Sequence, residues 1–243
     1  MTGDNESSVR RIFELPACVF CGSGDVSKEH LLAAWVFRSV QRTRRPRINV
    51  MRRSLNTGDI DHRYGEAQDA AAVACTTCNN GWMSRLDEAA ALVLKPLVRG
   101  EGPVVLAPAQ QRDVATWAVK TIIVNDLPIT GGASRLAEFA PALRETNIPL
   151  SFMEVWVGPP GAPALAGGMR VLGVVPHDGQ LVLGTGPDRQ EHALNSWKLM
   201  LGYVDLLLRP TLRWVPLPDP DGYTRIWPAD DRDVTVVPEI RTP

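Results

Sequence analysis

Hydrophobic residues recur at helical spacing in the middle of the chain. Two stretches place apolar side chains three or four positions apart, which is the repeat of one helix face. The first predicts an amphipathic helix that ends near Gly100. The second predicts a helix over residues 114–124, and residues 134–144 predict another that is interrupted at Pro141. The first stretch contains Trp82, Leu86, Ala89, Ala90, Val93, Leu94 and Leu97.

Toward the C-terminus the pattern changes to short apolar runs between turn residues, which is typical of strands. The sequence Pro-His-Asp-Gly at residues 176–179 lies between two such runs and predicts a hairpin turn. Residues 197–208 fit the spacing of a helix and of a long strand equally well, so both interpretations stay open. The predicted strands are residues 152–157, 169–175, 180–184, 214–217, 223–227 and 234–237.

The N-terminal half gives a mixed pattern. Residues 27–37 begin with the good N-cap residue Ser27 and predict a helix, or a strand that turns into a helix. Residues 38–65 are polar and basic and predict a long loop. Small residues at 70–74 predict a strand that leads to the second cysteine pair.

Glycine and proline cluster at residues 100–108, which indicates a boundary. The 243 residues are enough for one large domain or two small ones. We expect an α+β protein with a flexible N-terminus at residues 1–17, a zinc domain at 18–105 and a small α+β domain at 106–243.

All four cysteines lie in two CxxC pairs, Cys18 with Cys21 and Cys75 with Cys78. They offer four soft ligands at tetrahedral geometry, which suits a structural Zn²⁺. A redox-active pair, two disulfides and unconnected buried thiols are the alternatives. The N-terminus has no apolar signal segment, and no run of about 18 apolar residues occurs. We therefore expect a cytoplasmic protein, bacterial or phage-encoded, with reduced thiols and no membrane partner.

A basic segment lies between the two cysteine pairs. Seven arginines follow His30, and no acidic residue occurs before Asp59. A polyanion would relieve their mutual repulsion, and the planar guanidinium suits phosphate groups. We expect nucleic acid as the partner, DNA rather than RNA, and a solvated arginine-rich loop is the alternative. The arginines are Arg38, Arg42, Arg44, Arg45, Arg47, Arg52 and Arg53.

Three stretches together resemble a zinc-containing HNH endonuclease. They are Cys-Val-Phe-Cys at 18–21, Ser-Lys-Glu-His-Leu-Leu at 27–32 and Val-Ala-Cys-Thr-Thr-Cys-Asn-Asn-Gly-Trp-Met-Ser at 73–84. The resemblance covers about residues 18–97 and does not reach the C-terminal half. It implies a ββα-metal, treble-clef-like zinc fold in the N-terminal half.

By position, the resemblance also implies three catalytic residues. Glu29 and Asn79 would hold a catalytic Mg²⁺ or Mn²⁺, ions that prefer oxygen ligands. His30 would be the general base, since an imidazole titrates near neutral pH. A capping or core histidine and a turn asparagine are the alternatives for His30 and Asn79. We interpret Trp35 and Trp82 as core packing rather than base-stacking platforms.

The match departs from the family pattern at three places. Ala33 stands where the family usually has proline, and Asn79 stands where many members have histidine. The middle asparagine of the pattern is expected near Ala70, where the chain has none. Gln68 or Asp69 would have to orient the histidine in its place.

These features predict a metal-dependent HNH-type endonuclease that hydrolyses phosphodiester bonds in DNA, with a structural zinc site of four cysteines. One alternative is a nucleic-acid-binding zinc protein without catalytic activity. The other is a zinc-stapled module that binds another protein through its arginines.

Overall fold

The computed structural model describes residues 13–40, 48–53, 60–65, 70–159, 172–183, 190–211 and 219–238. Within them the fold is α+β, as the sequence predicts. The helical elements are α1 (Ala34–Val40), η1 (Cys78–Met83), α2 (Ser84–Arg99), α3 (Pro108–Thr130), η2 (Arg135–Phe139) and α4 (Ala140–Thr146). The strands are β1 (Phe13–Glu14), β2 (Val26–His30), β3 (Ile48–Arg53), β4 (Ile60–Gly65), β5 (Ala70–Cys75), β6 (Val104–Leu106), β7 (Met153–Gly158), β8 (Leu172–Leu183), β9 (Gln190–Leu201), β10 (Val204–Pro210), β11 (Thr224–Trp227) and β12 (Val234–Val236).

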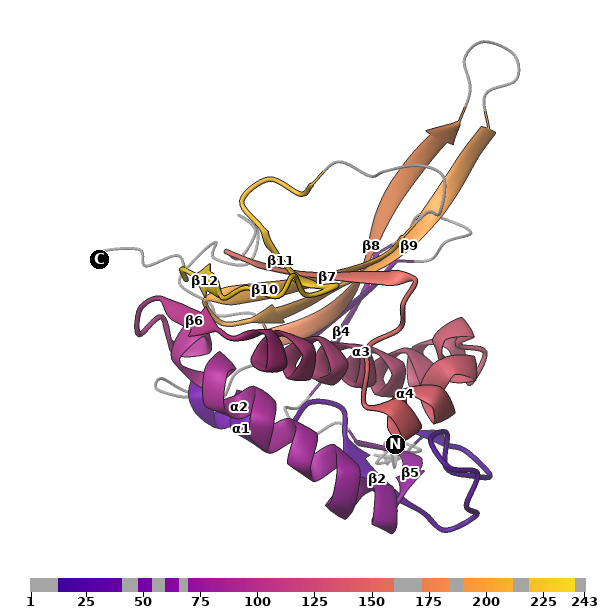
Figure 1. Cartoon of the computed structure of the whole chain (residues 1–243). Coiled ribbons are helices and arrows are strands. Elements are labelled where there is room, and N and C mark those ends of the chain that lie inside the picture. Colours follow the sequence, from indigo (N-terminus) through magenta and orange to yellow (C-terminus); the bar gives the residue numbers. More distant parts are fainter. Residues whose placement is uncertain are drawn as a thin grey trace, which may run out of the picture.

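The helix α3 lies at the centre of the molecule. Figure 1 shows it between the largest sheet and a layer that contains α2, β2 and β5. Residues 114–125 of α3 are all buried, as expected for a helix with apolar residues on every side. One buried core extends from Cys18 to Val236 and continues across the boundary expected at residue 105. The division into two domains stays a prediction.

The helix α2 confirms the amphipathic helix predicted from its spacing. It ends at Gly100, whose φ of 69° is the left-handed conformation that glycine adopts without strain. The backbone N–H groups of Gly100 and Glu101 donate to the carbonyls of Leu97 and Pro96 at 3.0 and 2.9 Å. The buried face consists of Leu86, Ala90, Ala91, Val93, Leu94, Leu97 and Val98.

A three-stranded sheet in the order β1-β5-β2 contains Cys75 at the end of β5 and the predicted catalytic residues Glu29 and His30 in β2. The strands β2 and β5 pair antiparallel, from Val26 opposite Cys75 to His30 opposite Ala70. The chain then turns from β2 into α1, so the strand-into-helix interpretation of residues 27–37 is confirmed. The strand predicted at residues 70–74 is confirmed by β5.

The C-terminal half forms a five-stranded sheet in the order β11-β7-β10-β9-β8. Residues 197–208, whose pattern fitted a helix or a strand, belong to β9 and β10, which meet at Gly202. The strands predicted at 152–157, 223–227 and 234–237 are confirmed by β7, β11 and β12. The strand predicted at 214–217 lies outside the described residues.

The hairpin turn predicted at residues 176–179 is wrong. These residues lie inside β8, which pairs with β9 without interruption from Leu172 opposite Leu201 to Leu183 opposite Gln190. Continuous pairing along a strand of 12 residues outweighs the local turn preference of Pro, Asp and Gly. Figure 1 shows the far ends of β8 and β9 extending beyond the rest of the described fold.

The loop predicted for residues 38–65 is also wrong in part. The strands β3 and β4 pair antiparallel, from Ile48 opposite Gly65 to Arg53 opposite Ile60. The strand β3 contains the apolar residues Ile48, Val50 and Met51, and the arginines on either side of them led to the prediction of a polar loop.

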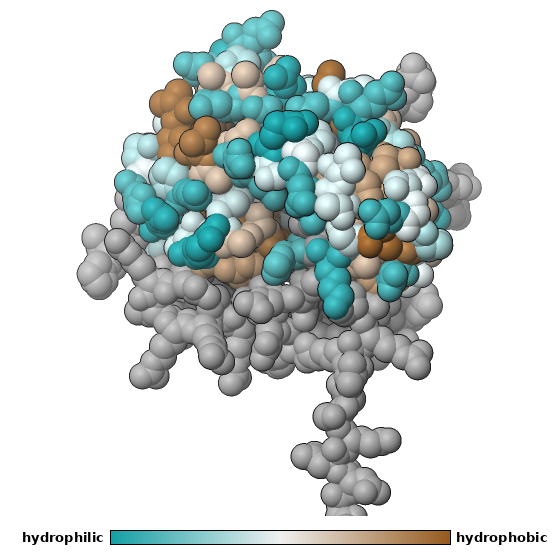
Figure 2. All heavy atoms as spheres, turned by 90° about the horizontal axis from the view of Figure 1, so that it is seen from below, coloured by the Kyte–Doolittle hydropathy of each residue, from teal (hydrophilic) through white to brown (hydrophobic). Residues whose placement is uncertain are grey.

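Seen from below the view of Figure 1, the described surface is mainly hydrophilic with separate hydrophobic patches (Figure 2). Large hydrophobic side chains exposed among the described residues are Leu92, Val105, Phe139, Ile148 and Val237. Across the described ranges, no helix has both the length and the apolar character needed to cross a membrane.

Candidate metal centre and catalytic residues

The two cysteine pairs lie on tight turns at one end of the antiparallel strand pair β2–β5. In the first turn, the backbone N–H of Cys18 donates to Ser23 at 2.7 Å, and that of Gly22 donates to Cys18 at 2.8 Å. Gly22 has a φ of 74°, which permits this reversal. In the second turn, Cys75 ends β5 and Cys78 begins η1, with the Cys78 N–H 3.4 Å from the Cys75 Sγ.

The four sulfur atoms form one cluster, in which all lie within 4.8 Å of one another. The Sγ atoms of Cys21 and Cys75 lie 3.5 Å apart, well beyond the roughly 2.05 Å of a disulfide. All four thiols are free. Zinc–sulfur bonds of about 2.3 Å in a tetrahedron place sulfurs about 3.8 Å apart. The cluster therefore fits a structural Zn²⁺, and the disulfide alternative does not hold.

The surroundings of the thiols favour a cation. Burial raises the pKa of Cys18, and burial together with the neighbouring thiols raises that of Cys78. The exposed Cys21 differs, because hydrogen bonds from the Ser23 backbone and from other thiols lower its pKa to about 7. Buried thiolates are costly unless a positive charge compensates them, and a bound metal ion supplies that charge.

The aromatic residues beside the cysteines pack into the core, as predicted. The rings of Phe20 and Trp82 lie 5.1 Å apart, so the first cysteine turn contacts η1 through them. Trp35 is buried and lies 5.5 Å from Trp117 of α3. Trp82 also donates from its Nε1 to the Asn147 Oδ1 at 2.9 Å.

His30 and Glu29 lie at the end of β2 away from Cys75. The His30 side chain is exposed, which a core histidine would not be. Glu29 pairs through its backbone with Ala71, and its side chain lies outside the described residues. The imidazole of His30 is therefore accessible to solvent.

Asn79 directly follows Cys78 and is half-buried, whereas Asn80 is exposed. Both belong to η1, where the Ser84 N–H donates to the carbonyls of Asn79 and Gly81. The bond to Asn79 spans five residues, the pattern of a π-helix, and such segments are frequent at functional sites. No signal in the sequence indicated this irregular start. The convergence of Glu29, His30 and Asn79 on one ion stays a prediction.

The arginine surface stays a prediction too. Arg38 lies in the last turn of α1 and is exposed. Arg52 and Arg53 lie in β3, and their side chains are outside the description. Arg42, Arg44, Arg45 and Arg47 fall outside the described residues.

We call residues 18–40 and 70–99, which carry the cysteines and the predicted catalytic groups, the zinc module. Buried polar contacts between the zinc module and α3 were not foreseen from the sequence. The Asp87 Oδ1 accepts hydrogen bonds from Trp117 Nε1 at 2.7 Å and from Lys120 Nζ at 2.8 Å. The Asn125 Nδ2 donates to the Leu31 carbonyl at 2.6 Å.

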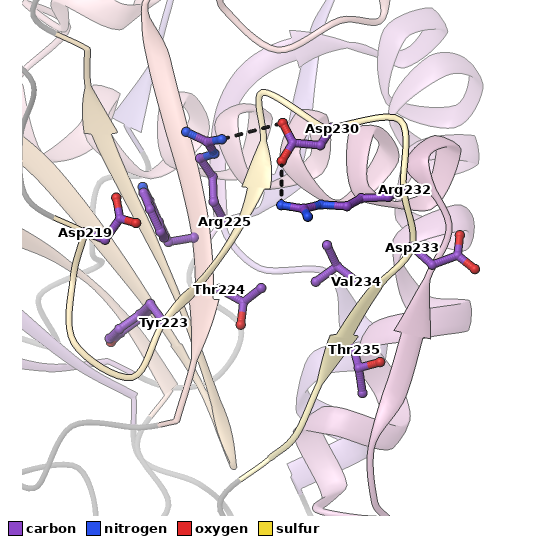
Figure 3. A pocket seen from close by; sticks show the side chains of 10 residues that line it. Asp219, Tyr223, Thr224, Arg225, Asp230, Arg232, Asp233, Val234 and Thr235 are labelled. Carbon is purple, nitrogen blue, oxygen red and sulfur yellow. Dashed lines mark hydrogen bonds and ion pairs between the residues drawn. The ribbon is translucent and has the colours of Figure 1, made fainter.

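A separate pocket of about 450 Å³ lies beside β11 and β12 (Figure 3). Asp230 lies between two arginines there, 3.5 Å from Arg225 and 3.1 Å from Arg232. Asp219 and Asp233 also line the pocket, so its carboxylates outnumber its guanidiniums. This charge balance does not favour a phosphate ligand.

No family model, no curated protein and no solved structure matches the chain. A proposal for the function therefore rests on the chemistry of the described residues.

Proposed function

We propose that the protein is a metal-dependent HNH-type endonuclease that hydrolyses phosphodiester bonds in DNA. The observation that carries the proposal is the cluster of four free thiols at one end of the paired strands β2 and β5. A zinc ion there would link the turn before β2, the strand that ends in His30, to η1, in which Asn79 follows Cys78. A ββα-metal arrangement of this module is part of the proposal.

Each proposed residue answers a need of phosphodiester hydrolysis. His30 takes a proton from the attacking water, and its exposed side chain is open to solvent. Glu29 and Asn79 would hold Mg²⁺ or Mn²⁺, and such an ion would stabilise the charge that develops on the phosphate and on the leaving oxygen. The zinc ion takes no part in the reaction, since four thiolates leave it no open position.

The substrate assignment comes from charge. The arginines between His30 and Asp59 would bind the phosphate backbone and contribute affinity without reading sequence. DNA cleavage should therefore weaken steeply as salt concentration rises.

Nicking of supercoiled plasmid tests this function. The purified protein should nick DNA with Mg²⁺ or Mn²⁺ and stop when EDTA is added. His30→Ala should lower the rate on the order of 10²- to 10⁴-fold while zinc content stays unchanged. Lys28→Ala, an exposed residue on the same strand, is the matched control and should cleave normally. Absence of cleavage with every divalent ion and every nucleic-acid substrate would refute the proposal.

A second candidate function is a nucleic-acid-binding zinc protein without catalytic activity. The chain supports it because no asparagine occurs near Ala70, where the residue that orients the histidine was expected. Such a protein would bind DNA or RNA in a salt-sensitive way, and replacement of Arg44 and Arg45 would weaken the binding. It would cleave neither nucleic acid with any metal ion.

A further inference from the structure

A buried carboxamide from α3 contacts the backbone directly after His30. Asn125 is 7% exposed. Its Nδ2 donates to the Leu31 carbonyl at 2.6 Å and to the Thr121 carbonyl, one turn earlier in α3, at 2.7 Å. Both hydrogens of the amide are thus used, and one of the two bonds joins α3 to the zinc module.

The hydrogen bond between Asn125 and Leu31 lies directly after His30, where the chain leaves the sheet. The imidazole is exposed, so side-chain packing does not hold it, and its location depends on the backbone. The pairing of His30 with Ala70 is the last pair between β2 and β5. Beyond His30 the chain leaves the sheet, and the Leu31 carbonyl meets Asn125 before α1 begins at Ala34.

The hydrogen bond from Asn125 also bears on the asparagine that is missing near Ala70. The chain lacks an asparagine near Ala70, where an orienting residue was expected. Gln68 and Asp69, the other candidates for that role, lie outside the described residues. Among the described residues, the carboxamide of Asn125 in α3 is a polar group that contacts the segment directly after His30.

We propose that Asn125 is the positioning residue for His30, so that the C-terminal half supplies part of the nuclease site. This inference rests on the proposed function. Asn125 touches neither substrate nor metal in this account. It fixes the Leu31 carbonyl and thereby the direction in which the imidazole meets the attacking water.

Two variants separate the bond to Leu31 from the bond within α3. Asn125→Ala removes both bonds. Asn125→Ser keeps a hydroxyl that can donate to the Thr121 carbonyl, as serine does in helices, but is too short for Leu31. Thr121→Val is the matched control, because its buried hydroxyl has no hydrogen-bond partner among the residues that the structure describes, and valine has a similar shape.

The first readout is steady-state cleavage of plasmid DNA with Mn²⁺. Both Asn125 variants should lower kcat by about 10- to 100-fold, the range typical of lost outer-shell support, with KM little changed. Thr121→Val should cleave like the wild type. A loss of kcat no larger than that of the control would overturn the proposal, and so would loss of fold and zinc in both Asn125 variants.

The second readout does not need activity. The chain has four histidines, and the His30 imidazole signal in a ¹⁵N spectrum is identified by its absence in His30→Ala. This signal should shift or broaden in both Asn125 variants and stay unchanged in Thr121→Val. If the wild type cleaves no nucleic acid, the proposed nuclease function fails. The ¹⁵N signal of His30 then still tests whether Asn125 positions His30. An unchanged His30 signal would then refute it.

Discussion

The zinc module and the five-stranded sheet hold their strands together by different means. The buried residues of β5 are mostly alanine, from Ala71 to Ala74, and bury little apolar area apart from Val73. The central strands β7 and β10 instead bury large side chains, among them Val155, Val157, Leu206 and Leu208. Hydrophobic stabilisation scales with buried apolar area, so side-chain packing stabilises β7 and β10 more than it stabilises β5. A metal ion bound at Cys75 would add stability at the end of β5.

Removal of zinc should give the largest difference between the two regions. Structural zinc contributes about 10–16 kcal/mol of apparent binding energy in small zinc peptides, comparable to the stability of a whole domain. Cys78→Ser should lose the ion and expose the amides of β2, β5 and η1 to exchange, while β7 and β10 stay protected. Hydrogen–deuterium exchange measures both regions in one experiment.

Thr77→Ser, at an exposed position between the two cysteines of the pair, is the control for this variant and should keep zinc and protection. Equal loss of protection in both regions would show that the sheet depends on the metal as well.

Asp87→Ala should give a smaller effect, located at the contact between α2 and α3. The Lys120 side chain is only 5% exposed, and the variant leaves it and the Trp117 Nε1 without their shared acceptor. Removing one partner of such a pair costs about 3–5 kcal/mol, and the 20% exposure of Asp87 favours the lower end. Urea unfolding should show the loss, and Glu88→Ala, an exposed neighbour, should not change stability.

The sheet offers a matched pair for this test. Lys198 contacts Asp205 at 2.8 Å, and the Asp205 side chain is fully buried. Lys198→Met should therefore also destabilise the protein, but without faster release of zinc to a chelator. Faster release from Lys198→Met than from Asp87→Ala would contradict the separation of the two regions.

Asp126 of α3 should give the smallest effect, visible through its pH dependence. Burial raises the pKa of Asp126, although the side chains of Ser134 and Trp197 act in the opposite direction. The folded state thus binds this proton more tightly than the unfolded state, and the carboxyl contributes less to stability as the pH rises through its folded pKa.

Asp126→Asn should accordingly melt at a higher temperature than the wild type at pH 7. The difference should shrink as the pH falls toward the ordinary aspartate pKa of about 3.9. A variant that melts lower at pH 7 would show that the charged carboxylate is stabilised where it lies.

The local elements and the cysteine cluster were predictable from the sequence because their signals are short-range. The spacing of apolar residues predicted α2, Gly100 predicted its end, and the paired CxxC spacing predicted the cluster of four cysteines. The turn predicted at residues 176–179 failed because strand pairing with β9 decided the conformation there. The sequence pattern of one segment does not show which strand it pairs with.

The contacts between the two halves had no signal in the sequence for the same reason. Asn125 and Leu31 are separated by 94 positions, and Asp87 and Trp117 by 30. Each residue is ordinary in its own segment, and Asp87 could not be told from a solvent-facing helix residue. Only the packing of α3 against the zinc module gives these side chains their role.

The most direct test of the account is a crystal structure of the protein with Mn²⁺, with anomalous diffraction recorded at the zinc and manganese absorption edges. We predict a zinc peak bonded at about 2.3 Å to the Sγ atoms of all four cysteines. We also predict a manganese peak with oxygen ligands from Glu29 and Asn79 and with the His30 imidazole facing its open side. A zinc peak without any manganese between those three side chains would contradict the nuclease site.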